Sequence, residues 1–172
     1  MQTETRPTRI ADAIVAEMEQ EAATTKKLLE IVPEDKLTWR PHPKAMSLGR
    51  LAMHIAILQG GVAELADLDS TEPPNFPEPE ATSRAEILEA FAASQAKARA
   101  IVGGTDDARA LAEWKLTKDG ATLLAMPRAA FWRSILLNHN YHHRGQLSTY
   151  LRELDIPLPS IYGPSADTNP FA

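Results

Sequence analysis

Four segments of this chain repeat their apolar residues every three to four positions, which is the period of an amphipathic α-helix. They cover residues 8–32, 47–65, 83–103 and 127–154. Helices of this length bury their apolar faces best by packing against one another. The pattern therefore predicts an all-α protein, a four-helix bundle, in one domain that spans residues 1–172.

Local signals mark where these helices begin and end. Pro33 ends the first helix, because proline cannot donate a backbone hydrogen bond. Ser47 is a good N-cap for the second helix, and residues 83–86 (Ser-Arg-Ala-Glu) form a capping box for the third. Gly103-Gly104 closes the third helix, and Pro127 suits the first turn of the fourth.

The connections carry turn signals. Residues 70–79 are rich in proline and cannot be helical. Asp119-Gly120 lies between residues 114–117 and 121–124, which favours a small β-hairpin before the last helix.

After Ile156 the chain is rich in proline and glycine, and it can be ordered only by packing on the helices. Ile161 and Tyr162 are the bulky adjacent pair expected to anchor this tail. The tail is either a passive strap or a wall of the functional pocket, and a strap is the favoured interpretation.

Composition narrows the classes of partner. The chain has 18 Lys and Arg against 23 Asp and Glu, for a net charge of −5, and its basic residues are scattered. Nucleic acid is therefore a poor partner, because phosphate binding needs a concentrated positive patch. No apolar run approaches the roughly 18 residues of a membrane span, and residues 1–6 are polar rather than part of a secretion signal. We expect a cytoplasmic protein that binds neither nucleic acid nor membrane.

Two histidines stand out in the fourth helix. His139 and His143 are four residues apart, so both side chains leave the same face, toward the interior. His142 lies about 100° from His143 around the helix and cannot share that direction. On the second helix His54 lies on an apolar stripe with Leu51. Three neutral imidazoles with an open position are a common way to hold a catalytic divalent metal.

Structural roles compete with this hypothesis. A single histidine such as His54 on an apolar face is commonly satisfied by a neighbouring hydroxyl or carbonyl group. The pair at 139 and 143 is harder to explain so, because each unpaired imidazole costs about 1–3 kcal/mol in a dry core. His42, between two prolines, is expected to be an exposed loop residue.

Two glutamates of the first helix, Glu17 and Glu21, project near its apolar face. Either could orient a ligand imidazole or act as a base beside a metal. The favoured interpretation places both at the edge of the buried stripe, with their carboxylates reaching water.

Several blocks of the sequence resemble the DinB/YfiT-like family of metalloenzymes. They are residues 37–48 running into His54, residues 126–128, residues 137–147 with the pattern H-x-x-x-H-R-G-Q, and residues 159–167. The resemblance implies a four-helix bundle that often forms homodimers. It also implies a metal triad of one histidine from the second helix and two from the fourth, at positions that match His54, His139 and His143. The family's metals are nickel, zinc or iron, so the resemblance does not name the ion.

A divalent ion on three neutral imidazoles keeps its full charge and would activate water for hydrolysis, or a thiolate for transfer. This chain has no cysteine, so such a thiol would come from a low-molecular-weight cosubstrate. The leading hypothesis is a metal-dependent hydrolase or thiol transferase acting on a small molecule. The alternative is a non-catalytic, stress-linked binding module whose metal joins two helices.

A homodimer is also expected, mainly from the family resemblance. The second and third helices carry small residues that would allow close contact with a second chain. These residues are Ala63, Ala66, Ala92, Ala93 and Ala96.

Overall fold

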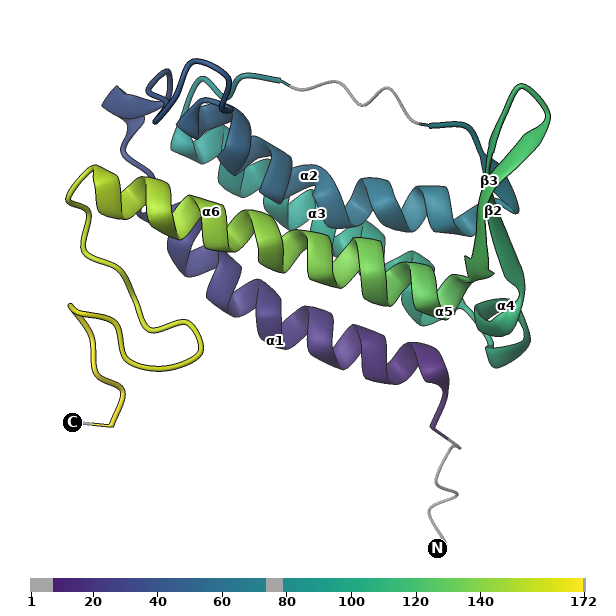
Figure 1. The fold of residues 1–172 in the computed structure, drawn as a ribbon. Helices are drawn as coiled ribbons and strands as arrows, with labels where there is room; N and C mark the ends of the chain where they lie inside the picture. The colour runs from purple at the N-terminus through teal and green to yellow at the C-terminus, as the bar shows by residue number, and fades with distance from the viewer. Residues whose placement is uncertain (1–7, 74–78, 172) are drawn as a thin grey trace, which may run out of the picture.

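The structure is a computed structural model that describes residues 8–73 and 79–171. It is mostly helical, and its long helical segments lie side by side (Figure 1). These segments are α1 (Ile10–Glu30), α2 (Leu48–Asp67), α3 (Arg84–Gly104), and a continuous stretch formed by α5 (Arg128–Phe131), the π-helical η2 (Trp132–Asn138) and α6 (His139–Glu153). The short elements are η1 (Glu34–Lys36), β1 (Ser70–Thr71), α4 (Asp107–Leu111), β2 (Glu113–Lys118) and β3 (Ala121–Pro127).

The predicted helix signals act where expected. The Ser47 hydroxyl accepts a hydrogen bond from the Arg50 amide at 3.2 Å, and the Ser83 hydroxyl accepts one from the Glu86 amide at 3.1 Å. Each satisfies an amide that has no partner within its helix. Pro127 differs slightly from expectation. It is the last residue of β3 and the N-cap residue of α5, one position before the first turn of that helix.

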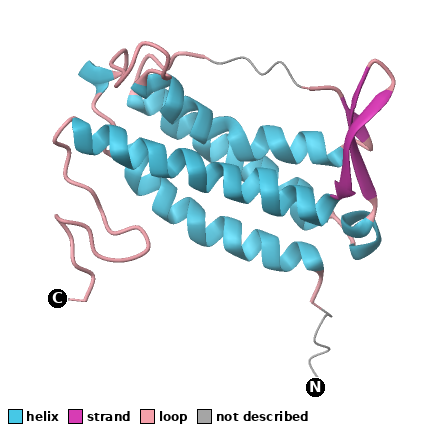
Figure 2. Cartoon of the chain, viewed as in Figure 1, coloured by secondary structure: helices cyan, strands magenta, loops and turns pink. Residues whose placement is uncertain are grey.

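A small sheet corrects the all-α expectation. The predicted hairpin is present as β2 and β3, and Asp119 and Gly120 both have positive φ angles, of 50° and 79°, as its tight turn requires. A third strand, β1, pairs in parallel with β2. Two residues carry too little pattern to predict a strand. The sheet stands at one end of the helices (Figure 2).

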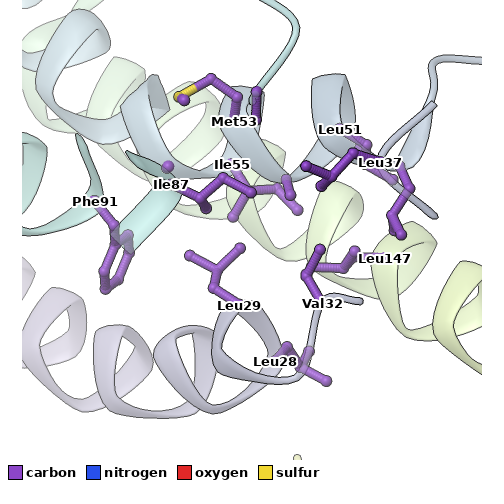
Figure 3. Packing of buried hydrophobic residues seen from close by; sticks show 14 of the residues in the cluster. Leu28, Leu29, Val32, Leu37, Leu51, Met53, Ile55, Ile87, Phe91 and Leu147 are labelled. Carbon is purple, nitrogen blue, oxygen red and sulfur yellow. The ribbon is translucent and has the colours of Figure 1, made fainter. Parts of the chain in front are cut away.

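The core has two parts along the helices. The part away from the sheet packs leucines and isoleucines from all four long helical segments, including Leu29, Ile55, Ile87 and Leu147 (Figure 3). The part near the sheet contains the aromatic side chains of Trp114, Phe131 and Trp132. The helices are thus held at both ends of the molecule.

Helix α2 lies in very close contact with α3. Gly60 donates a backbone hydrogen bond to the Ser94 hydroxyl at 2.8 Å, and a Cβ at Gly60 would meet that oxygen at 2.9 Å. Ala63 and Ala66 are buried within the chain's own core. The expectation that these two alanines meet a second chain is therefore wrong, whereas Ala92, Ala93 and Ala96 are exposed on α3.

Two expectations concern residues outside the described ranges. The polar N-terminus at 1–6 lies wholly outside them, and so do residues 74–78 of the proline-rich connection. Within the described part of the chain, no helix combines the length and the apolar character that a bilayer span requires.

Candidate metal centre

Helices α2 and α6 bring three distant histidines together. His54 lies in the middle of α2, and His139 and His143 lie on successive turns at the start of α6. One ring nitrogen of each lies within 4.8 Å of one from each of the others. The ring of His54 is 4.4 Å from that of His143 and 5.5 Å from that of His139, centroid to centroid. The three side chains predicted from helical projection therefore converge.

The orientation of His143 is set by a neighbour on the same helix. Its Nδ1 lies 2.7 Å from the side-chain oxygen of Gln146, which can only accept a hydrogen bond. The proton of a neutral His143 is therefore on Nδ1, and Nε2 keeps its lone pair. That Nε2 is 2.6 Å from Nε2 of His139. A hydrogen bond that fixes the tautomer in this way is typical of metal-ligating histidines.

His54 supplies the test of whether the site suits a metal. Its Nε2 is buried and has no hydrogen-bond partner in the described part of the chain. A buried nitrogen without a partner costs free energy, and no hydroxyl or carbonyl of the described residues pairs with it, as the structural alternative for His54 would require. A metal ion would satisfy this nitrogen together with the other two, so the donor set fits a divalent ion of the nickel, zinc or iron kind.

The environment keeps the imidazoles neutral, as ligands must be. Burial lowers the pKa of His143 to about 4, and neighbouring imidazoles add to this effect while Gln146 opposes it. Burial also lowers the pKa of His54 and of His139, with further lowering from His139 and Arg50 in the first case and from His142 in the second. At neutral pH protons therefore do not compete for these nitrogens.

A π-helical segment leads into the site. Residues 132–138 form η2, directly before His139. Such wide turns are rare and occur often at functional sites. Ordinary helical projection gave no sign of this segment.

A cavity of about 440 Å³ opens beside the histidines, and His54 and His139 line it. His143 does not line the cavity and is 7% exposed. Two of the three histidines thus adjoin a space large enough for a small molecule.

The other two histidines are placed as predicted. His142 and His42 are both exposed, and neither belongs to the cluster of three.

The interpretation of the glutamates is wrong for Glu21. Its carboxylate is buried and forms an ion pair with the buried Arg144 at 2.6 Å. The edge position holds for the half-buried Glu17, which accepts hydrogen bonds from Arg133 and, at 2.8 Å, from the Tyr141 hydroxyl. In the described structure neither carboxylate contacts a histidine, so neither orients a ligand. A helical projection cannot show that an arginine on another helix faces Glu21.

The C-terminal tail is attached as expected at one residue and differently at the next. Ile161 packs against the core. Tyr162 as a residue is 72% exposed, but its hydroxyl donates to Glu21 at 2.9 Å and also contacts Arg144. The tail is therefore joined to the buried ion pair, and none of its described residues lines the cavity.

Solved structures share this fold. A DinB-like protein from Bacillus cereus ATCC 10987 superposes with a TM-score of 0.69 at 22% identity, over 88% of this chain and 97% of that one. A DinB-like protein from Bacillus subtilis, YjoA, superposes with a TM-score of 0.67 at 19% identity, over 87% of this chain and 97% of that one.

Sequence comparison points the same way. The chain is 29% identical over 158 residues to the uncharacterized protein YrdA of Bacillus subtilis strain 168, covering 91% of this chain and 90% of that protein. The model of the DinB family matches residues 1–169. This chain therefore belongs to the DinB family.

Proposed function

We propose that this protein is a metal-dependent enzyme in which His54, His139 and His143 hold a divalent ion of nickel, zinc or iron. Its reaction activates water or a low-molecular-weight thiol toward a small-molecule substrate, as a hydrolase or a thiol-dependent transferase. The observation that carries the proposal is the buried Nε2 of His54, which lacks a hydrogen-bond partner in the described chain and faces two more imidazoles. Membership of the DinB family agrees with a metal-binding role.

The residues around the site have separate roles in this proposal. Gln146 keeps the Nε2 lone pair of His143 available, and burial keeps all three imidazoles neutral. When bound, the ion would supply positive charge that lowers the pKa of water or of a thiol. The adjoining cavity admits the substrate, which favours an enzyme over the alternative of a metal that only joins two helices.

The wider assembly is part of the same proposal. In this proposal the four long helical segments form a four-helix bundle. The protein is located in the cytoplasm, and two copies of it form a homodimer. The exposed alanines of α3 are suited to close contact. Light scattering tests the dimer, since a monomer would have the chain mass of 18.9 kDa.

Metal content is the first test. Protein stripped with EDTA is loaded with Ni²⁺, Zn²⁺ or Fe²⁺ and examined by elemental analysis. We expect one equivalent for the native chain and none for His54→Ala or His143→Ala, because two imidazoles bind far more weakly than three. His142→Ala is the control and keeps one equivalent. Equal metal in the native chain and His143→Ala would contradict the proposal.

Turnover is the second test. Metal-loaded protein is screened with low-molecular-weight thiols plus electrophiles, and separately with simple esters and amides. Metal-dependent turnover in either screen, lost in His143→Ala, is the expected result. Full metal binding without turnover in either screen would favour the non-catalytic binding module.

A further inference from the structure

We infer that the cavity beside the histidines binds an uncharged, apolar molecule. If the proposed function holds, this molecule is the hydrophobic body of the substrate. The inference starts from the walls of the cavity, which come from both the helices and the small sheet. Most of the lining is aliphatic or aromatic, as in sites for small organic ligands. Prominent members are Ile57, Val62, Leu116, Leu124, Phe131 and Ile135.

The sheet closes one side of this space. Leu116 of β2 and Leu124 of β3 are register partners, so their side chains leave the same face of the hairpin, and both line the cavity. Successive side chains of a strand point to opposite faces. Leu123, next to Leu124, is 57% exposed and does not line the cavity. The hairpin therefore turns one leucine of this adjacent pair into the cavity and the other away from it.

Charge in the lining is already balanced. Its two charged side chains are Glu64 of α2 and Lys97 of α3, which form an ion pair of 2.7 Å. Both are about half exposed, so the pair lies at the solvent edge of the cavity. In the metal-free chain, a charged ligand would have to leave water without meeting an unpaired opposite charge, which is unfavourable.

Two neutral polar side chains of the lining already donate hydrogen bonds to the protein backbone. The Thr71 hydroxyl donates to the carbonyl of Glu72 at 3.0 Å, and the Trp114 indole donates to the carbonyl of Leu65 at 3.0 Å. One end of the cavity is formed by His54 and His139, and there Nε2 of His54 has no hydrogen-bond partner in the described structure. The lining therefore favours a ligand that has an uncharged, apolar body and at most one polar end, with that end directed at the histidines.

The volume agrees with a small molecule as the occupant. About 440 Å³ lies in the lower part of the range of roughly 300–1,000 Å³ that such pockets occupy.

The test compares two dyes that share one ring system. N-phenyl-1-naphthylamine is uncharged, and 8-anilino-1-naphthalenesulfonate adds a sulfonate to the same rings. Both fluoresce more strongly in an apolar site. On metal-free protein we expect saturable 1:1 binding of the neutral dye, with at least tenfold weaker binding of the sulfonate. Equal or tighter binding of the sulfonate, or no saturable binding of the neutral dye, would overturn the inference.

A matched pair of variants locates the dye. Leu124→Trp fills the cavity and should weaken the neutral dye at least tenfold. Leu123→Trp, on the opposite face of the same strand, should change its affinity less than twofold. An equal effect of both variants would overturn the inference.

A direct measurement covers the case in which Leu124→Trp does not fold. In an NMR titration of the native chain, the neutral dye should shift the indole N–H resonance of Trp114, which lines the cavity. Trp39, which packs in the other part of the core, should not respond. A shift at Trp39 but not at Trp114 would place the dye elsewhere and overturn the inference.

Failure of this inference and failure of the proposed function are distinguishable. Dye binding is measured on metal-free protein, and metal content is measured without dye. Binding of the neutral dye at Trp114 without metal uptake supports the inference and contradicts the proposed function. Stoichiometric metal uptake without dye binding does the reverse.

Discussion

At the scale of single residues, the histidine cluster depends on a side chain that never faces the cavity. Gln146 is exposed, and its oxygen accepts the Nδ1 proton of His143. It lies three residues after His143, one turn along the same face of α6. The H-R-G-Q pattern therefore contains both a histidine of the cluster and the group that orients it.

Removing this orienting group should weaken metal binding without unfolding the protein. Gln146→Ala leaves Nδ1 of His143 without its acceptor, and we expect metal affinity to fall about 10–100-fold. Chelator competition on the purified protein measures the change. His142→Ala is the control and should stay within twofold of the native chain. An unchanged affinity in Gln146→Ala would show that the hydrogen bond does not support the site.

Glu21 carries a second prediction at this scale. Its buried carboxylate pairs with Arg144, so Glu21→Ala leaves an uncompensated buried guanidinium and should cost about 3–5 kcal/mol of unfolding free energy. Glu19→Ala is the control, because the exposed Glu19–Arg99 pair should contribute only about 0–1 kcal/mol. Urea unfolding measures both, and similar values for the two variants would contradict this account.

At the scale of elements, one arginine joins the sheet to the helices. Arg128 is buried and donates to the carbonyl of Ala66 in α2 at 2.9 Å and to that of Glu113 in β2 at 3.2 Å. Its charge is balanced by Asp69 at 2.6 Å, which also pairs with Arg109. This junction holds the hairpin beside α2 and so fixes one wall of the cavity.

The junction makes stability depend on pH. Hydrogen bonds and charge from Arg109, with a further contribution from Arg128, hold the pKa of Asp69 below its usual range. The unfolded chain therefore takes up this proton at higher pH than the folded chain. The stabilisation is fully present above the unfolded value of about 3.9 and is lost as the pH falls through the folded value.

Thermal melts of the native chain and Asp69→Asn measure this dependence. We expect a constant difference in Tm from pH 5 to pH 8, closing as the pH falls below about 4. Asp67→Asn keeps both ion pairs and is the control, with no such closing difference. A difference for Asp69→Asn that persists unchanged to pH 2 would contradict the assignment.

At the scale of the whole molecule, the tail links the C-terminal end of the chain to α1. Ile161 packs on the core, and Tyr162 adds its hydroxyl to the Glu21–Arg144 pair. Because the described tail stays outside the cavity, this arrangement favours a strap over a pocket wall.

Truncation after Pro159 separates these two roles. The strap predicts a lower Tm with metal content and any activity intact. The variant Tyr162→Phe keeps the chain length and removes the hydroxyl that bonds to both Glu21 and Arg144, so it should lose about 1–3 kcal/mol. Differential scanning calorimetry and elemental analysis measure both, and loss of activity at unchanged Tm would mean that the tail belongs to the site.

Much of the secondary structure follows from the sequence because its signals are local. Ser47 and Ser83 cap the helices that they precede, and Asp119-Gly120 turns the hairpin, each through contacts within a few residues. The shared direction of His139 and His143 is equally local, since helix geometry alone places side chains four residues apart on one face.

Tertiary structure decided what depends on contacts between distant segments. The packing of α2 against α6 brings His54 to the other two histidines, and Arg144 buries a glutamate that the pattern on α1 places at the edge. The strand β1 and the cavity behind the hairpin likewise arise only where α2 meets the sheet. A helix propensity or a residue spacing contains no information on which face of another helix will lie opposite. That is settled by the packing of the whole core, because each buried face must find a partner of complementary shape and charge.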